Sequence, residues 1–114
     1  MKLTTDKVVF DFCKDNEPAI EVDVPATITV ATKDCFSNQL REPSDTIDAL
    51  DWNNTNPVTG PIFIKGAQSG DTLKVTIDSI EVDAKGTVCA IEGEGTIGHR
   101  ISGSHSKIIS VKDG

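Results

Sequence analysis

The run TLKVTIDSIEVD has the most regular pattern in the chain, because apolar and polar residues alternate along it. Leu73, Val75 and Ile77 fall on one side of an extended chain, since successive side chains of a β-strand point to opposite faces. The apolar positions then move to Ile80 and Val82, and a shift by one residue is typical of a β-bulge. The run therefore predicts a strand with one apolar face.

Other segments favour β-structure because they alternate in the same way or are rich in β-branched and aromatic residues. We expect strands over Lys7–Cys13, Ile20–Val24, Ala26–Thr32, Ile62–Lys65, Val88–Glu92 and Lys107–Lys112. Turns are expected at GAQSGD, before the alternating run, and at AKGT, after it. Pro25 has no N–H group for a sheet ladder, so it marks a sheet edge or a break between two strands.

The middle of the chain favours a short helix and then a stiff connector. Ser44 and Asp45 are placed to cap a helix near residues 45–51, with apolar side chains of IDALDW on one side. The connector Asn56–Asp71 holds two Pro and three Gly residues, which fix backbone geometry at low entropy cost. Such a connector is either a purely structural turn or a wall of a site.

These elements predict a mainly β fold, either an antiparallel sandwich of jelly-roll type or a barrel, with the one short helix. A chain of 114 residues is expected to form a single β-rich domain over residues 1–114. Aromatic residues make up only 4%, so the core must consist mainly of Ile, Val, Leu and Ala. Trp52 and the four Phe residues are expected to anchor it.

The acidic composition limits the partners. The net charge is −7, from 18 acidic and 11 basic residues, so nucleic-acid phosphates and anionic membrane surfaces repel the chain. We expect neither nucleic acid nor membrane as a partner. The sequence has no run of about 18 apolar residues, and the N-terminal MKLTTDKVVFDF is polar where a signal peptide is apolar. We therefore expect a cytoplasmic protein.

Three cysteines, Cys13, Cys35 and Cys89, show no CxxC spacing. Their odd number and their spacing argue against a disulfide framework and against a cysteine-rich zinc site. We expect reduced, partly buried thiols. The C-terminal Asp113-Gly114 is a dipeptide that commonly turns a strand back to a hairpin partner, yet no partner follows. This end indicates a piece of a longer sequence.

Three motifs resemble the acetamidase/formamidase family. The segment NPVTGPIFIKGAQSGDTLKVTIDSIEV is similar to a family signature in which a proline leads into a segment of the type TGPIYVEGAEPGDTLEVEI. Upstream, TKDCFSNQL resembles a strand end with an aspartate followed by glutamine, and downstream VCAIEGEGTIG resembles a proline-glycine-x-glycine loop. The resemblance runs from about Val22 to the C-terminus.

The resemblance implies a hydrolase that cuts short linear amides, such as formamide and acetamide, to carboxylate and ammonia. It also implies a divalent metal, usually zinc, as cofactor. The chain departs from the family in two ways. Ile91-Glu92-Gly93 stands where the family usually has Ile-Pro-Gly, and family enzymes are much longer. The histidine-bearing segments expected to complete the site then lie outside this chain, in the part that follows an N-terminal β-rich portion.

Candidate site residues follow from the resemblance and from the chemistry of amide hydrolysis, which needs an activated water, stabilisation of the oxyanion and an acid for the departing amine. Asp34 matches the family's aspartate, which implies a catalytic role as a metal ligand; the alternative is a solvated or turn-capping carboxylate. Asn38 and Gln39 could orient a substrate amide, or lie solvated at the surface. We expect Asn56–Pro61, with Asn56, Thr59 and Gly60 as substrate-binding residues, to form one wall of the amide pocket.

Other polar residues give weaker alternatives. Cys35 could act as a nucleophile only with a base beside it, and His99 and His105 lie far along the chain. The two histidines could themselves bind a metal, but their spacing matches no helix or strand face, and solvent-exposed histidines fit the pattern better. Glu94, between glycines, could approach a site. GEGTIG lacks the Lys-Ser/Thr of a phosphate-binding P-loop.

Two functional hypotheses remain. The chain is the N-terminal portion of a metal-dependent hydrolase of small linear amides, in which case we expect it to be inactive alone. Alternatively, it is a non-catalytic, truncated β domain that acts by self-association or by binding a complementary chain. A cut fold leaves unpaired strand edges and apolar surface, so we expect a homo-oligomer or a complementing C-terminal part as partner.

Overall fold

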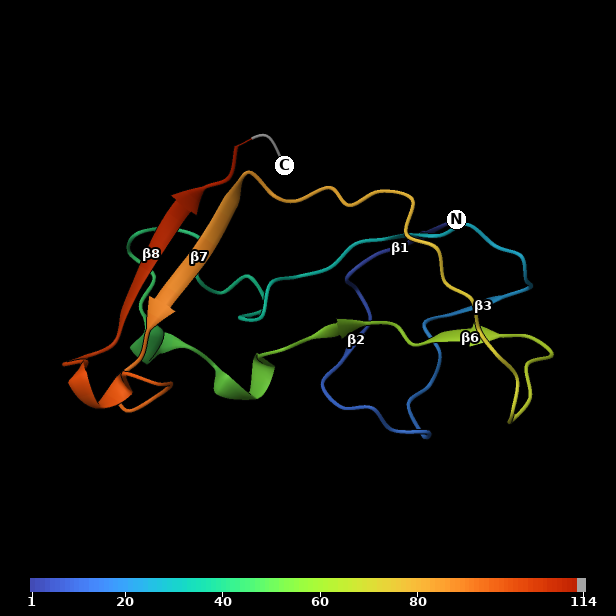
Figure 1. Cartoon of the computed structure of the whole chain (residues 1–114), viewed down its shortest axis with the longest axis horizontal. Coiled ribbons are helices and arrows are strands. Elements are labelled where there is room, and N and C mark those ends of the chain that lie inside the picture. Colours follow the sequence, from blue (N-terminus) through green and yellow to red (C-terminus); the bar gives the residue numbers. More distant parts are fainter. Residues whose placement is uncertain (113–114) are drawn as a thin grey trace. The chain divides into compact units, whose positions relative to one another are not determined.

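The structure is a computed structural model that describes residues 1–112 (Figure 1). Contacts between Cα atoms divide the chain into two compact units. The first unit comprises Met1–Ser37 and Trp52–Val75, and the second comprises Asn38–Asp51 and the chain from Thr76 onward. Each unit is therefore assembled from two stretches that are separate in the sequence.

The first unit is built from short strand pairs and one 3-10 helix. β1 (Lys2–Leu3) pairs parallel to β4 (Thr29–Val30), β3 (Ile20–Val22) pairs parallel to β6 (Ile62–Ile64), β2 (Val8–Val9) pairs antiparallel to β5 (Val58–Thr59), and the helix η2 is Trp52–Asn54. Val22 stands opposite Ile64 in the register of β3 and β6. Leu3 and Val22 are the buried apolar side chains of this unit, so its core is small.

The second unit contains the two longest strands (Figure 1). β7 (Lys85–Ala90) and β8 (His105–Ser110) pair antiparallel, and the 3-10 helices are η1 (Ile47–Ala49) and η3 (Gly98–Arg100). Leu40, Ile47 and Leu50 are its buried apolar side chains. The Thr87 hydroxyl of β7 donates a hydrogen bond to the Leu40 carbonyl oxygen at 2.8 Å. This bond fastens the strand pair to the segment that carries the core residues.

The predicted mainly β character is confirmed, with differences in detail. The described strands form four two-stranded sheets and no closed barrel. Antiparallel pairing holds for β2–β5 and β7–β8, whereas β1–β4 and β3–β6 are parallel. The first unit joins strands from distant parts of the sequence, and such pairs are not limited to the antiparallel geometry of a hairpin.

The short helix predicted near residues 45–51 is present only as the three-residue 3-10 helix η1. Thr46 is the N-cap of η1 and makes no side-chain capping bond. The Asp45 carboxylate, expected to cap the helix, instead accepts hydrogen bonds from the main-chain N–H groups of Arg41 and Glu42, both at 2.8 Å. Asp45 therefore closes the turn that precedes η1.

The alternating run does not form the predicted strand, and AKGT does not form the predicted turn. No β-strand is assigned within the described residues between Ile64 and Lys85. An extended segment becomes a strand only when a neighbouring strand takes up its main-chain hydrogen bonds. AKGT instead opens β7, where Gly86 lies opposite Ile109. A Cβ atom at Gly86 would lie 3.4 Å from the Ile109 side chain, so the missing side chain leaves room for this isoleucine.

The remaining strands are mostly shorter than predicted. Lys7–Cys13 contains only β2, and Ala26–Thr32 contains only β4. The last strand begins earlier than expected, at His105. The Asp-Gly turn predicted at the C-terminus lies outside the described residues. None of the helices within residues 1–112 is long and apolar enough to cross a membrane.

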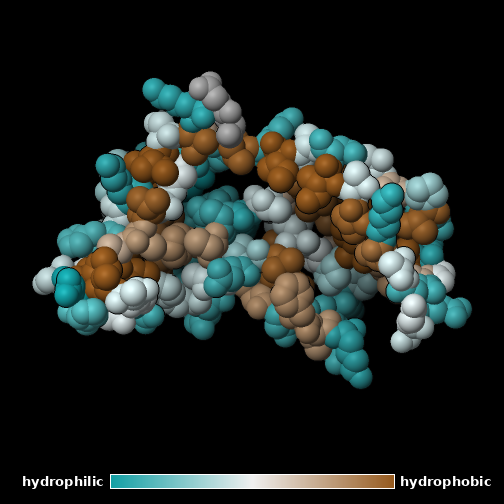
Figure 2. Space-filling model, viewed as in Figure 1, coloured by the Kyte–Doolittle hydropathy of each residue, from teal (hydrophilic) through white to brown (hydrophobic). Residues whose placement is uncertain are grey.

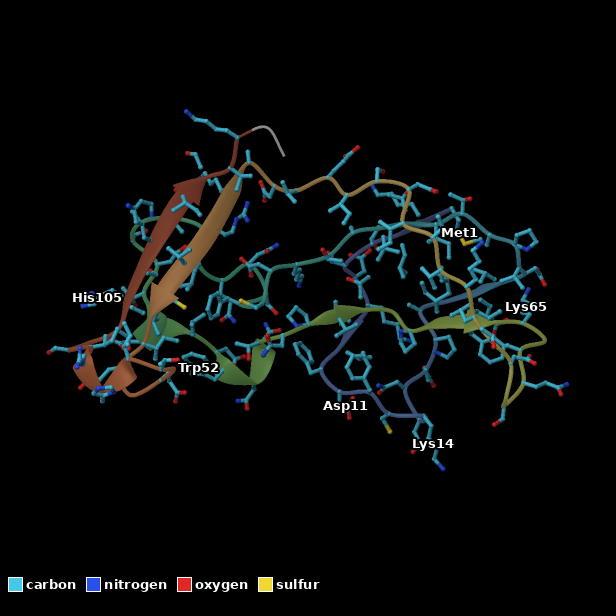
Figure 3. The ribbon with its side chains drawn as sticks, in the orientation of Figure 1. Met1, Asp11, Lys14, Trp52, Lys65 and His105 are labelled. Atoms are coloured by element: carbon cyan, nitrogen blue, oxygen red, sulfur yellow. The ribbon has the colours of Figure 1, made fainter. Side chains whose placement is uncertain are left out.

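The predicted aromatic anchors of the core are wrong. Trp52, labelled in Figure 3, is 54% exposed, and Phe12 is 92% exposed. The cores of the two units are instead aliphatic, as the low aromatic content required. The three cysteines are free, as expected, but all are exposed rather than partly buried.

Candidate functional site

Asp34 opens a tight turn after β4. Its Oδ1 atom accepts a hydrogen bond from the Phe36 N–H group at 3.0 Å, and its carbonyl oxygen accepts one from the Ser37 N–H group at 3.0 Å. The prediction that Asp34 lies at a strand end is wrong, because β4 ends at Val30. Ser37 and Asn38 have φ of 54° and 61°, a left-handed conformation that asparagine tolerates better than most residues.

Two hydrogen bonds join this turn to the segment after η2. The Ser37 hydroxyl donates to Asn54 Oδ1 at 3.1 Å, and the Asn56 N–H group donates to the Cys35 carbonyl oxygen at 2.7 Å. Ser37 is buried, whereas Asn56 is exposed and has a φ of 55°. The structure therefore brings two predicted site segments together within the first unit, the Asp34 turn and the start of the Asn56–Pro61 connector.

Thr59 and Gly60, predicted to bind substrate, have their donors engaged in the fold. The Thr59 hydroxyl donates to the Ala31 carbonyl oxygen at 2.7 Å, and the Gly60 N–H group donates to the Lys7 carbonyl oxygen at 3.3 Å. Gly60 is buried at a φ of 134°, which side-chain-bearing residues rarely adopt. These contacts fix the connector against its neighbours, and a direct role in substrate binding stays a prediction.

A cavity of about 210 Å³ opens beside the connector in the first unit. It is lined by Val9, Asp11, Phe12, Cys13, Asn16, Val58, Gly60 and Pro61. The Asn16 side-chain amide donates to the Asp11 carbonyl oxygen at 3.0 Å and thereby closes the loop after β2, on which Figure 3 labels Asp11. Gly60 and Pro61 belong to the wall predicted from sequence. Neither Asp34 nor Asn56 is among the described residues that line this cavity.

Asn38 and Gln39 belong to the second unit. Asn38 is exposed. The Gln39 side-chain amide pairs with the main chain of Asp51: its Nε2 atom donates to the carbonyl oxygen at 3.2 Å, and its Oε1 atom accepts from the N–H group at 2.9 Å. This pairing uses the donor and acceptor that were expected to orient a substrate amide. A second cavity, of about 160 Å³, is lined by Gln39, Ser44, Asp45, Thr46, Ala49 and Leu50.

Two carboxylates of the second unit have a pKa below the ordinary range. The main-chain N–H groups of Arg41 and Glu42 stabilise the ionised form of Asp45 and lower its pKa, against a smaller effect of burial. The hydrogen bond from the Arg41 guanidinium lowers the pKa of Asp83, with Arg41 Nη2 and Asp83 Oδ2 2.6 Å apart. Both groups are tied to the fold, and neither was among the predicted site residues.

The alternatives that involved cysteine and histidine fall in different units. Cys35 is exposed in the first unit, and His99 and His105 are exposed in the second. His105, labelled on β8 in Figure 3, has its Nε2 atom 3.1 Å from the Ser102 carbonyl oxygen. Glu94 is exposed in the loop after β7. A role for any of these residues stays a prediction.

The described residues do not fit a complete metal site. No three His, Cys, Asp or Glu side chains among them come together in a way that could hold a metal ion. Asp34 has one carboxylate oxygen committed to the Phe36 N–H group. If it were a ligand, the others would have to come from outside these residues.

The family assignment comes from a comparison with protein-family models. Residues 4–108 match the model described as the acetamidase/formamidase family. The chain belongs to the acetamidase/formamidase family. A comparison with curated proteins gave no match.

Two solved structures are similar to the chain. One is an acetamidase from Bacillus halodurans, with 30% sequence identity and a TM-score of 0.92 over 98% of this chain. The other is a predicted acetamidase/formamidase from the thermophile Thermoanaerobacter tengcongensis, with 46% identity and a TM-score of 0.92 over 99% of this chain. This chain spans only 38% of the length of each of these two proteins.

The departure from the family's Ile-Pro-Gly loop has a structural counterpart. The Glu92 carboxylate accepts a hydrogen bond from the Gly103 N–H group at 2.8 Å, and the Glu92 N–H group donates to the Ser104 hydroxyl at 3.2 Å. A proline would provide neither contact, because it lacks both the carboxylate and the N–H group. Glu92 thus ties together the two ends of the loop between β7 and β8.

Sequence reasoning missed the residues that hold the Asp34 turn in place. Ser37 and Asn54 were not singled out, although Ser-Asn at positions 37 and 38 is a turn signal. The bond between Asn56 and Cys35 joins main-chain atoms, so it cannot be predicted from the residue types at these positions.

Proposed function

We propose that this chain contributes to the hydrolysis of short linear amides, such as formamide and acetamide, to carboxylate and ammonia, as the N-terminal portion of a larger catalytic unit. The observation that carries the proposal is the family match over residues 4–108. The junction of the Asp34 turn with Asn56 supports it, because two segments singled out by their resemblance to the family lie side by side in the first unit.

In this proposal Asp34 provides a carboxylate beside the substrate, and the exposed Asn56 provides an amide that can donate to and accept from a small amide. The hydrogen bond from Phe36 holds one Asp34 oxygen in place, so the carboxylate needs little reorganisation to act. Asn38, Gln39, Thr59 and Gly60 remain proposed substrate-binding residues. A neutral amide also suits a chain of net charge −7, because that charge does not repel it.

A divalent metal, zinc by expectation, would polarise the amide carbonyl and lower the pKa of a bound water. The described residues do not form a complete set of ligands, so the proposal assigns the chain at most one ligand, Asp34. The proposed sandwich-like arrangement of the sheets would likewise be completed by the rest of the catalytic unit.

The first experiment measures ammonia release from formamide and acetamide by the purified chain, with metal content assayed on the same sample. We expect no activity from the chain alone. Ammonia release with a stoichiometric metal would refute the proposal that this chain is one portion of the site, since the site would then be complete within it.

The second experiment uses a chimera in which this chain replaces the matching part of the Thermoanaerobacter tengcongensis protein, with that protein as the positive control. Asp34→Asn keeps an acceptor for the Phe36 N–H group but removes the negative charge. We expect it to lower kcat/KM of the chimera by about 100-fold or more. Asp48→Asn is the matched control, because Asp48 is exposed on η1, and it should leave activity within about twofold.

An Asp34→Asn chimera with full activity, together with an Asp34→Ala chimera that loses stability, would assign Asp34 to the turn alone. The second candidate function is the non-catalytic one, in which the chain acts only by association. The exposed apolar run between β6 and β7 favours it, and a chimera that folds as its parent does but releases no ammonia would support it.

A further inference from the structure

The stretch from Thr72 to Val82 combines an extended backbone with exposed apolar side chains; we call it the open strand. It lies between β6 and β7 and is assigned to no helix or strand. Its large apolar residues are exposed as follows: Leu73 61%, Val75 71%, Ile77 71%, Ile80 75% and Val82 53%. Figure 2 shows hydrophobic residues gathered at the surface over this part of the chain. Contiguous apolar surface of this kind marks an interaction site.

The main chain of the open strand is also unsatisfied within the described residues. Hydrogen bonds hold the residues on either side of it: the Asp71 N–H group donates to the Gln68 carbonyl oxygen, and the Arg41 guanidinium donates to the Asp83 carboxylate. No main-chain hydrogen bond joins residues 72–82 to any residue that the structure describes. A row of N–H and C=O groups without partners is what the edge of a sheet offers to another strand.

The sequence of the open strand is nonetheless that of a paired strand. It is rich in β-branched residues, and its first half alternates with Leu73, Val75 and Ile77 on one side and polar residues on the other. Local sequence and local structure therefore disagree over this segment. The disagreement disappears if a strand and an apolar surface from elsewhere cover the segment.

The comparison with the two solved relatives indicates what covers the open strand. This chain matches each of them over nearly its whole length at a TM-score of 0.92, yet more than half of each relative has no counterpart here. A second copy of this chain is a poorer occupant, because each copy carries a net charge of −7 and like charges oppose association.

We propose that the open strand is a docking strand, which pairs by β-augmentation with the portion of the acetamidase/formamidase fold that this chain does not contain. The main chain provides the attachment, and the apolar side chains of the open strand provide the buried surface. The inference rests on the part of the proposed function that makes this chain one portion of a larger unit, and not on amide hydrolysis itself.

Hydrogen–deuterium exchange tests the proposal. The chimera with the Thermoanaerobacter tengcongensis protein is compared with the isolated chain, residue by residue. We expect the amides of residues 72–82 to exchange at least about tenfold more slowly in the chimera, because strand pairing protects main-chain N–H groups. Equal exchange in the two proteins would overturn the proposal. So would a chimera that does not fold when its parent does, since the open strand would then not fit the remainder.

Two substitutions separate main-chain pairing from apolar burial. Thr76→Pro removes one N–H donor and keeps every apolar side chain of the open strand. Ile77→Asp places a charge on its apolar side. We expect each to lower the melting temperature of the chimera by at least about 5 °C and to leave the isolated chain unchanged, because both positions are exposed there.

Ile97→Asp is the matched control, since Ile97 is 60% exposed and lies outside the open strand. If Ile77→Asp and Ile97→Asp lower the melting temperature of the chimera equally, the docking role cannot be assigned to the open strand. Light scattering on the isolated chain tests the other occupant. A dimer whose amides 72–82 are protected, and which Ile77→Asp dissociates, would assign the open strand to a second copy and overturn the proposal.

The outcomes for docking and for activity are independent. Protection of the open strand in a chimera that releases no ammonia would support docking and count against the proposed hydrolase. Ammonia release by a chimera whose open strand stays unprotected would support the proposed hydrolase and count against docking.

Discussion

Leu40→Ala gives the sharpest test of how the second unit is held together. The Leu40 side chain is 1% exposed, and Ile47 and Leu50 are the other buried apolar side chains of that unit. Replacing a buried leucine by alanine costs about 2–5 kcal/mol, from the lost transfer free energy and from the cavity that remains. Because few other buried side chains remain to stabilise the unit, we expect the free energy of unfolding to decrease by about 3 kcal/mol.

A decrease of about 3 kcal/mol raises the unfolded-to-folded ratio of the second unit by roughly 100-fold, since about 1.4 kcal/mol corresponds to a factor of ten. The assay is hydrogen exchange of the amides of β7 and β8, supported by urea denaturation followed by far-ultraviolet circular dichroism. Exchange reports on the second unit by itself, because the Thr87 hydroxyl bonds the Leu40 carbonyl oxygen and couples β7 to this core.

Leu73→Ala is the matched control in the isolated chain. It is the same chemical change at a side chain that is 61% exposed, so the free energy of unfolding should change by no more than about 0.5 kcal/mol. If Leu40→Ala shifts stability by less than about 1 kcal/mol, or if Leu73→Ala shifts it as much, the assignment of the core to Leu40 is refuted.

Three further predictions follow from the contacts of the second unit. Gly98→Ala should lower the free energy of unfolding by about 1–3 kcal/mol in a thermal melt, because its Cβ atom would lie 2.6 Å from the Gly93 carbonyl carbon; no change would contradict this close packing. Glu92→Ala should speed exchange of the loop N–H group that its carboxylate binds, and Glu92→Gln, which keeps an acceptor, should restore part of the protection. Asp45 and Asp83 have a lowered pKa in the fold, so their stabilisation is present above the unfolded pKa of about 4 and is lost as pH falls through the folded values. The melting temperature should therefore decrease as the pH is lowered below about 4. The decrease should be less steep in the Asp45→Asn variant.

The sequence predicted the class of the fold because that prediction depends on composition and alternation alone. Ile20–Val22 and Ile62–Ile64 form strands as their β-branched residues indicated. Strand pairing was a harder problem. β1 pairs with β4 and β3 pairs with β6 in parallel, and contacts between such distant segments depend on the whole fold rather than on local sequence.

The largest error concerned the segment with the clearest local signal. Alternation in the run that begins at Leu73 describes what the segment would do beside a partner strand, and the described residues offer none. The helix expected near residues 45–51 is only three residues long, and Thr46 rather than Asp45 is its N-cap. Asp45 was expected to cap it, but its carboxylate accepts hydrogen bonds from the N–H groups of Arg41 and Glu42, which precede it in the sequence.

The arrangement of the candidate site could not be predicted from the sequence. The resemblance singled out Asp34 and Asn56 separately, and only the structure shows that a main-chain hydrogen bond joins Asn56 to the turn that Asp34 opens. The engagement of the Gln39 amide with Asp51 could not be anticipated, since any glutamine at the surface looks equally available in a sequence.

The bond between Asn56 and Cys35 has a consequence for how such a site can change. It joins an N–H group to a carbonyl oxygen, so its strength does not depend on which side chain position 35 carries. Exchange of the exposed Cys35 side chain leaves both atoms of this bond in place. Position 56 is less free, because its φ of 55° favours asparagine or glycine. One side of this junction can therefore diversify by single substitutions while the other preserves its shape.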